Sequence, residues 1–544
     1  MGNPSHPAAM NGVEMQEGLK SSSLETHESP NDFPLDYPER KVARAYDSNQ
    51  GTEKNQLRRL FSFSQLLAFA LTFMSSWEVV AMNTGATFYN GGPRALSWGI
   101  IAVTIGSLTQ AMSMAELASI QPIAGAQYHW TALLAPEKQR KFITWMQGWV
   151  TWLAWVTALA GSTSGEAAVL QGLISTNYPD YVPERWHLTL IMYALLITVG
   201  LVNMYAFWLI PWLELASGVM HVVLWIIFVV VLVTLGPRHK ANFVFFEGGA
   251  QSGWTSSFVA FNLGMLVPAW GFIGFDGVVH MSEEVRKAKQ AVPRTMIYTI
   301  IINGVLAYGI GLVMLFTMGE PEGVLDSVYP IIPICINATG SQKAATAMVS
   351  GLIIITYCVI AASVASVSRI TWAWARDGAL PSALSHIHPR HKVPIRALWL
   401  PIVIVMLLAL LNIGSTAATA FSAFTALSSF GLYSSYIIAI GVTLHARVTG
   451  TLGDGPNAAV RYGGWRLWKG WGTPINIFAL AWTAYLTVFL AFPTTLPVTG
   501  TNMNYALPIY AGVVIATLVW WFVWGKARWP GLNMVPVNRV EIEE

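Results

Sequence analysis

Two acidic residues, Glu78 and Asp276, each lie close to a tryptophan and to small residues inside a long apolar stretch of this chain. The first stretch reads FALTFMSSWEVVAM over residues 69–82, and the second reads LVPAWGFIGFDGVVH over residues 266–280. A break in a membrane helix exposes backbone polar groups, which must be buried in protein or line a cavity. Two such breaks in matching positions of two halves are the best sequence indication of a transport substrate site.

The residues at the two breaks are the candidates for substrate binding. A half-helix N-terminus presents N–H groups and a positive dipole to an anionic group, and aromatic faces bind ammonium groups. Glycine lets a ligand approach the backbone closely, although small residues also serve tight helix packing and tryptophans also pack in cores. The candidates are Ser75, Ser76, Trp77, Glu78, Trp270, Gly271, Phe272, Gly274, Phe275 and Asp276.

Ionisable residues at membrane depth are costly to bury, so they are functional by default. Glu78 is the leading candidate for a proton acceptor or for the counter-ion of a substrate amine, with helix capping as the alternative. Asp276 follows the second break, where capping and function are equally open. His221 lies in a predicted span and is a second candidate for proton coupling, because histidine titrates near neutral pH.

The composition places the chain in the membrane class. Of its 544 residues, 54% are hydrophobic and 11% are charged, whereas about a quarter of a soluble domain is charged. A spanning helix needs about 20 apolar residues. Windows of that length predict twelve spans: 61–89, 95–118, 142–174, 187–205, 211–236, 257–281, 295–318, 344–375, 396–413, 417–446, 473–493 and 505–526.

The distribution of basic residues predicts the orientation. Loops on the same side as the N-terminus carry 24 Lys and Arg residues, and the opposite loops carry 5. Because basic loops stay in the cytosol, both termini are expected there. Asn337 begins a glycosylation sequon in a loop assigned to the outside, where a used site and a chance match are both open.

The breaks fall in the first and sixth predicted spans, so the natural division is five spans plus five. An odd number of spans per half inverts the second half relative to the first. This repeat rests on the break positions and the span count alone. The predicted parts are a disordered cytosolic tail (1–58), a ten-helix inverted-repeat transport core (59–446), two further helices with their preceding loop (447–527) and a cytosolic C-terminal tail (528–544).

Charged residues at the cytosolic ends of the predicted helices are candidates for an inner gate that opens when ion pairs break. The alternative is solvated loop charge that contributes little. Arg369, near the same end, is expected to extend its charged group to water. The gate candidates are Glu116, Glu283, Glu284, Arg376 and Asp377.

Several motifs resemble those of the fungal amino acid/choline transporters, a family of the amino acid–polyamine–organocation superfamily. They occur in the family's order and read SSWE, NGGP, AELAS, GAQYHW, GFDGVVHMSEEVRKAKQAVPR and ARDGALP, beginning at residues 75, 90, 115, 125, 274 and 375. The resemblance implies twelve helices in the LeuT-type fold, with the substrate site at the breaks of helices 1 and 6. It also implies transport of amino acids, 4-aminobutyrate, choline or similar amines, usually driven by protons.

The sequence therefore predicts a secondary active transporter, a multi-pass protein of the plasma membrane, that couples a small amine or amino acid to a proton. Sodium coupling stays open, with Ser363 and Ser366 as hydroxyl ligands. The alternatives are a permease specific for choline, other quaternary amines or polyamines, and a transporter-like nutrient sensor. Enzyme motifs such as HExxH or a phosphate-binding loop do not occur in the predicted spans, so no enzyme, cofactor, metal or nucleic-acid partner is expected.

Overall fold

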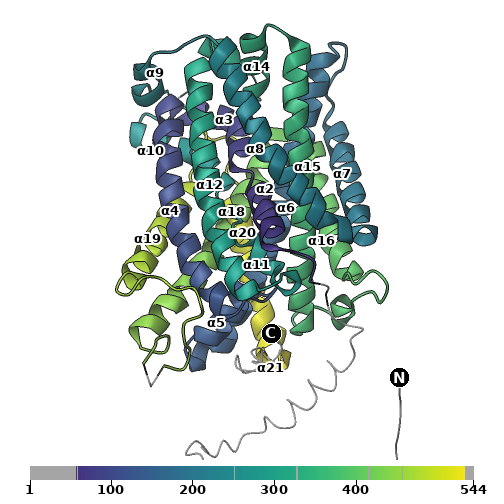
Figure 1. The fold of residues 1–544 in the computed structure, drawn as a ribbon, viewed down its shortest axis with the longest axis vertical. Coiled ribbons are helices and arrows are strands. Elements are labelled where there is room, and N and C mark those ends of the chain that lie inside the picture. Colours follow the sequence, from purple (N-terminus) through teal and green to yellow (C-terminus); the bar gives the residue numbers. More distant parts are fainter. Residues whose placement is uncertain are drawn as a thin grey trace, which may run out of the picture. The chain divides into compact units, whose positions relative to one another are not determined.

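The computed structural model describes residues 57–532 except 58, 250, 326, 328, 415, 416, 456, 457 and 501. The predicted N-terminal tail (1–58), apart from Leu57, and residues 533–544 of the predicted C-terminal tail lie outside the described residues. Long helices that run side by side make up the described part (Figure 1). Apart from two isolated β-bridges, its regular structure is helical, which confirms the predicted all-α class.

The helices follow one another with short connections. Their bounds are α2 (Phe63–Met74), α3 (Ser76–Asn90), α4 (Gly92–Ile120), α5 (Gln127–Leu134), α6 (Glu137–Asn177), α7 (Arg185–Tyr205), η2 (Phe207–Leu209), α8 (Ile210–Leu235), α9 (Ala241–Phe246), α10 (Ser257–Gly271), α11 (Gly277–His280), η3 (Ser282–Glu284), α12 (Ala288–Thr317), α13 (Pro321–Leu325), α14 (Ile331–Thr339), α15 (Gln342–Arg376), η4 (Ser382–Ser385), α16 (Ile395–Ala409), α17 (Leu411–Gly414), α18 (Ala417–Val448), α19 (Gly472–Leu490), α20 (Ala506–Trp520), η5 (Trp521–Gly525) and α21 (Lys526–Arg528).

Within the described residues, 10 helices are long and apolar enough to cross a membrane, with α2 and α3 counted as one. The two other predicted spans are also helical. Span 142–174 lies in α6, which has 41 residues and buries many polar side chains. Span 257–281 is divided into α10 and α11, because the helix ends at Gly271 and resumes at Gly277. The predicted breaks are therefore both present.

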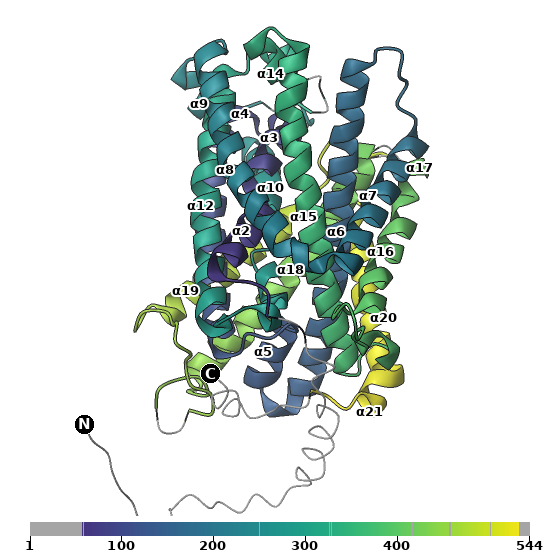
Figure 2. The same cartoon turned by 45° about the vertical axis from the view of Figure 1, so that its right-hand side comes forward.

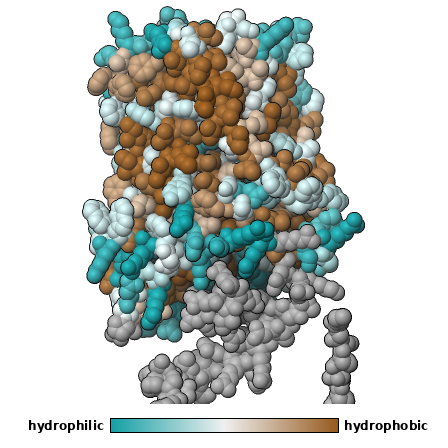
Figure 3. Space-filling model, in the orientation of Figure 1, coloured by the Kyte–Doolittle hydropathy of each residue, from teal (hydrophilic) through white to brown (hydrophobic). Residues whose placement is uncertain are grey.

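Loops predicted on opposite sides of the membrane lie at opposite ends of the helices. The segments α9 and α14 lie at one end, and α5 and α21 lie at the other, in both views (Figures 1 and 2). A broad apolar band covers the middle of the face in Figure 3, and hydrophilic residues gather below it. This surface suits a helix bundle surrounded by lipid, where backbone groups are satisfied within each helix.

Small residues bring the central helices close together, as is common inside membranes. In α4 and α12, which pack along each other, a Cβ added to Gly304 would lie 2.5 Å from Thr104 Cγ2. In α6 and α18, a Cβ added to Gly431 would lie 2.5 Å from Ala154 Cβ and 3.1 Å from its Cα. Backbone atoms cannot move aside as a flexible side chain can, so the α6–α18 contact requires glycine.

We expect Gly431→Val to separate α6 from α18 and to lower the free energy of unfolding by about 1–3 kcal/mol, the usual cost of overpacking. The measurement is the Tm of the detergent-purified protein. Gly441→Val is the matched control, because Gly441 lies in the same helix and nothing lies within 4 Å of its added Cβ. Equal Tm values for the two variants would contradict the packing argument.

Candidate functional site

The first helix break occurs at a single residue, Ser75. It ends α2 and starts α3 with φ 42° and ψ 44°, a left-handed conformation that is uncommon for a residue with a side chain. Its N–H donates to the Leu71 carbonyl at 3.1 Å, and its Oγ donates to the Thr72 carbonyl at 2.5 Å. These local bonds stabilise the reversal of the chain direction without any lipid-exposed backbone.

The second break extends from Phe272 to Asp276, between α10 and α11. Gly274 lies at its centre with φ +89°, a conformation that glycine adopts at little cost. The Gly274 N–H donates to the Tyr436 hydroxyl at 3.3 Å, and Ser366 Oγ donates to the Gly277 carbonyl at 2.8 Å. Polar groups of α18 and α15 therefore stabilise the open backbone.

One hydrogen bond joins the two breaks directly. Ser76 Oγ, at the start of α3, donates to the Gly271 carbonyl at the end of α10, at 2.6 Å. Both groups are buried. The break of the first span is thereby held against the break of the sixth.

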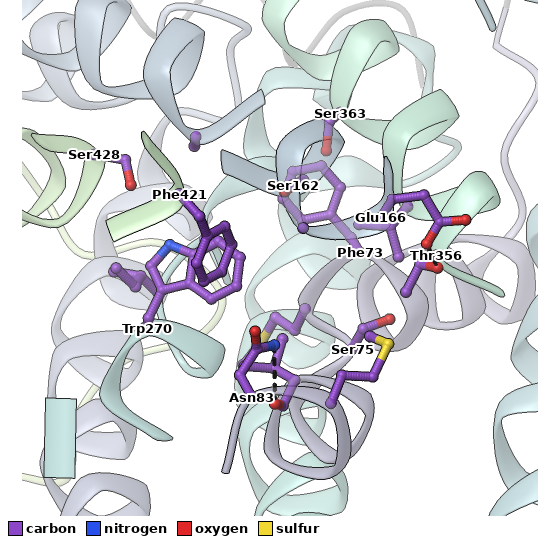
Figure 4. A pocket seen from close by; sticks show the side chains of 18 of the residues that line it. Phe73, Ser75, Asn83, Ser162, Glu166, Trp270, Thr356, Ser363, Phe421 and Ser428 are labelled. Atoms are coloured by element: carbon purple, nitrogen blue, oxygen red, sulfur yellow. Dashed lines mark hydrogen bonds between the residues drawn. The ribbon is translucent and has the colours of Figure 1, made fainter. Parts of the chain in front are cut away.

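A cavity of about 80 Å³ opens between the breaks and three long helices (Figure 4). Two aromatic pairs form much of its wall: Trp270 with Phe421, whose ring centroids are 5.5 Å apart, and Phe73 with Trp155, at 5.4 Å. The other lining residues are Met74, Ser75, Val79, Met82, Asn83, Ala158, Ser162, Gly165, Glu166, Val169, Ile273, Gly274, Thr356, Val359, Ser363, Ser428 and Leu432.

Three of the ten residues predicted for substrate binding line this cavity, namely Ser75, Trp270 and Gly274. The other seven do not. Their side chains or backbone make contacts around the breaks instead: Ser76, Trp77, Glu78, Gly271, Phe272, Phe275 and Asp276. A role in binding stays a prediction for the three that line the cavity.

Glu78 and Trp77 point toward α8 and meet the other predicted coupling residue there. His221 Nδ1 lies 2.6 Å from Glu78 Oε1, and Trp77 Nε1 donates to the same nitrogen at 3.0 Å. All three side chains are fully buried. The Glu78 side chain bonds to His221 and not to the helix end, and its Oε2 has no hydrogen-bond partner among the described residues. This geometry does not support helix capping as its role.

Asp276 holds the second break together. Its Oδ1 accepts a hydrogen bond from the Tyr436 hydroxyl at 2.5 Å, and its Oδ2 accepts one from the Gln127 amide of α5. His280 Nε2 lies 4.0 Å from Oδ2. Since Tyr436 also contacts Gly274 N, Asp276 fixes the backbone that lines the cavity without lining it.

Glu166 is the acidic residue of the cavity, and the sequence reasoning missed it. It is 2% exposed, and its Oε2 accepts a hydrogen bond from the Thr356 hydroxyl of α15. A signal was present, because Glu166 is the only charged residue between positions 142 and 174, and a charge in a membrane span is functional by default.

Two ion pairs join the ends of α11 and α15 on the side of the bundle where α5 lies. Arg369 Nε donates to Glu284 Oε1 at 2.7 Å, and Arg376 Nη1 lies 3.2 Å from Glu283 Oε2. Arg369 is fully buried and its guanidinium lies 4.0 Å from the Phe207 ring centroid. The expectation that Arg369 reaches water was therefore wrong, because Glu284 provides a buried partner.

The remaining gate candidates are also paired. Asp377 accepts hydrogen bonds from the Tyr128 hydroxyl at 2.8 Å and contacts His129 Nε2 at 2.9 Å. Burial tends to raise the pKa of Asp377, but His129 and Arg376 outweigh it and lower that pKa. Glu116 pairs with Arg447, which follows α18, and not with another candidate. The role of these pairs as a gate stays a prediction.

A second cavity, of about 580 Å³, lies toward the end of the bundle where α14 lies. Consecutive turns of α6 line the two cavities: Gly165 and Val169 line the first, and Ala168 and Gly172 line the second. The structure therefore has open space on the α14 side of the first cavity and ion pairs on the opposite side. Asn337, the predicted glycosylation residue, lies on α14 and is exposed.

The sequence matches a known family model over most of the chain. The model described as amino acid permease matches residues 61–515, which include both breaks and the cavity. The chain belongs to the amino acid permease family. This membership agrees with the helical bundle and with the two interrupted spans of the permease.

Individual relatives cover nearly the whole permease. It is similar to the choline transporter of Saccharomyces cerevisiae, with 30% identity over 510 residues, 92% of this chain and 86% of the relative. It is also similar to amino-acid permease 2 of Neurospora crassa, with 30% identity over 496 residues, 88% of this chain and 86% of the relative. A third relative, the amino-acid permease BAT1 homolog of Oryza sativa subsp. japonica, is 27% identical over 494 residues.

We expect Gly274→Leu to abolish uptake while the protein still reaches the cell surface. The added Cβ would lie 3.4 Å from both Phe73 and Trp155, so a leucine side chain would fill the cavity. Gly340→Leu is the matched control, since Gly340 also has a positive φ, +62°, but has nothing within 4 Å of its added Cβ. Normal uptake by Gly274→Leu, or equal loss in both variants, would contradict the assignment of this cavity as the site.

Proposed function

We propose that this permease is a secondary active transporter that moves an amino acid or a related small amine across the plasma membrane, with a proton as the coupling ion. The observation that carries the proposal is the cavity between two broken helices whose breaks are joined by the Ser76–Gly271 hydrogen bond. Relatives named for choline and for amino acids support this range of substrates.

The same geometry supports a transport cycle. The end that bears the Glu284–Arg369 and Glu283–Arg376 ion pairs is the cytosolic end in our proposal, together with both termini. The larger cavity beside Tyr329 then faces outward. This conformation is closed to the cytosol, and breaking the ion pairs opens the substrate cavity to the inside.

The Glu78–His221 pair supports proton coupling. A single Nδ1 atom faces both the Glu78 carboxyl, at 2.6 Å, and the Trp77 N–H, at 3.0 Å. When Nδ1 carries a proton, it donates to the carboxylate; when Glu78 carries it, Nδ1 accepts. The pair therefore holds a proton beside the first break, where its gain or loss changes the contacts between α3 and α8.

Uptake of labelled choline, 4-aminobutyrate and a panel of amino acids by cells that express the chain tests the proposed function. We expect saturable uptake of at least one of these solutes, stimulated by an inward proton gradient and abolished by a protonophore. Cells with an empty vector are the control. Uptake no higher than in that control would overturn the transport proposal, and uptake that needs sodium and resists the protonophore would overturn proton coupling.

We expect Glu78→Gln to keep exchange of substrate across the membrane and to lose accumulation driven by a pH gradient. Glutamine keeps the shape and one hydrogen-bonding oxygen but does not titrate. The measurement compares counterflow with pH-driven uptake in proteoliposomes. Glu137→Gln, an exposed substitution at the start of α6, is the control. Loss of exchange as well would assign Glu78 to substrate binding, and an unchanged pH profile would remove it from both roles.

A further inference from the structure

We propose that Glu166 is the counter-ion for the substrate, so that this site selects a compound with a single positive charge, such as a quaternary or primary amine, over zwitterionic amino acids. This inference rests on the proposed transport function. It identifies the substrate class within that function, and the residue that sets it.

The charges of the cavity carry the first step. Among its 21 described lining residues, Glu166 is the only one with an ionisable acid or base, and no Lys, Arg or His lines it. A buried charge is stable only when it is paired and hydrogen-bonded. A monocationic ligand neutralises an ionised Glu166, whereas a zwitterion leaves the occupied site with a net negative charge.

The hydrogen bonds of Glu166 carry the second step. Its Oε2 accepts from the Thr356 hydroxyl, while its Oε1 is buried and has no hydrogen-bond partner among the described residues. In the view of Figure 4, the carboxylate lies beside Thr356, on the opposite side from Trp270 and Phe421. Thr356 therefore orients the carboxylate and leaves one oxygen to bind a ligand.

The walls of the cavity carry the third step. Trp270 and Phe421 meet at an interplanar angle of 83°, and Phe73 and Trp155 meet at 56°. Aromatic faces attract cations through their quadrupoles, and ligands with quaternary ammonium groups are commonly held this way. The combination of aromatic faces with one carboxylate suits a hydrophobic cation better than a small neutral or zwitterionic solute.

A second buried carboxylate of the bundle provides a comparison. Glu214 of α8 is fully buried, and its Oε2 accepts a hydrogen bond from the Thr72 hydroxyl at 2.8 Å. Like Glu166, it has one oxygen without a hydrogen-bond partner among the described residues. Glu214 does not line the cavity. The substitution Glu214→Gln therefore makes the same chemical change outside the proposed site.

The test measures inhibition of labelled-substrate binding to the full chain in nanodiscs by three compounds. Choline is the monocation, 3,3-dimethyl-1-butanol is its neutral isostere with carbon in place of nitrogen, and betaine is a zwitterion with the same trimethylammonium group. We expect the wild type to prefer choline to both. Glu166→Gln should reduce the preference for choline over the neutral isostere about 10- to 100-fold, the usual effect of a charged hydrogen-bond partner. Glu214→Gln should leave the preference unchanged.

Two results would overturn the inference: equal binding of choline and its neutral isostere by the wild type, or an unchanged preference in Glu166→Gln. If Glu166→Gln gives no folded protein, Glu166→Asp keeps the charge and is expected to keep the preference, and the wild-type comparison decides if both fail. Failure of the proposed function looks different, because the wild type then transports none of the solutes. Transport of zwitterionic amino acids without preference for a monocation would leave that function standing and remove this inference.

Discussion

The arrangement of this protein depends on one constraint, which is that two interrupted helices must satisfy their backbone polar groups where lipid cannot. The Ser76–Gly271 hydrogen bond joins the interruptions, and Tyr436 and Ser366 bind the backbone of the second one. Because these partners come from α18 and α15, the breaks hold together helices that are far apart in the sequence. The open cavity exists only because the backbone around it is stabilised in this way.

The buried polar side chains near the breaks differ in how completely they are bonded. Asp276 has a hydrogen-bond partner for each oxygen, from Tyr436 and from Gln127, as expected of a residue that fixes structure. Glu166 and Glu78 each keep one oxygen without a partner among the described residues. An unpaired buried polar atom is costly and calls for an explanation. We assign the free oxygen of Glu166 to the substrate, and the contact of Glu78 with His221 to the proton.

Much of the fold follows from the sequence, because apolar length and the interruption by small residues are local signals. These signals located both breaks, and they predicted α6, α15 and α18 as the long helices. The site was only partly predictable. Trp77 and Glu78 lie next to the first break in sequence, but the helical turn after Ser75 directs them to His221 and away from the cavity. Glu166 and Phe421 reach the cavity through packing of α6 and α18, which no local pattern specifies.

The central claim is that substrate binds between the two breaks, and a map of the substrate-bound protein tests it most directly. Cryo-electron microscopy of the full chain in nanodiscs, at a saturating concentration of a transported amine, would locate the ligand. The account predicts ligand density between Trp270 and Glu166, in contact with the backbone at Gly274. Density only in the larger cavity beside Tyr329, with the inner cavity empty, would contradict it.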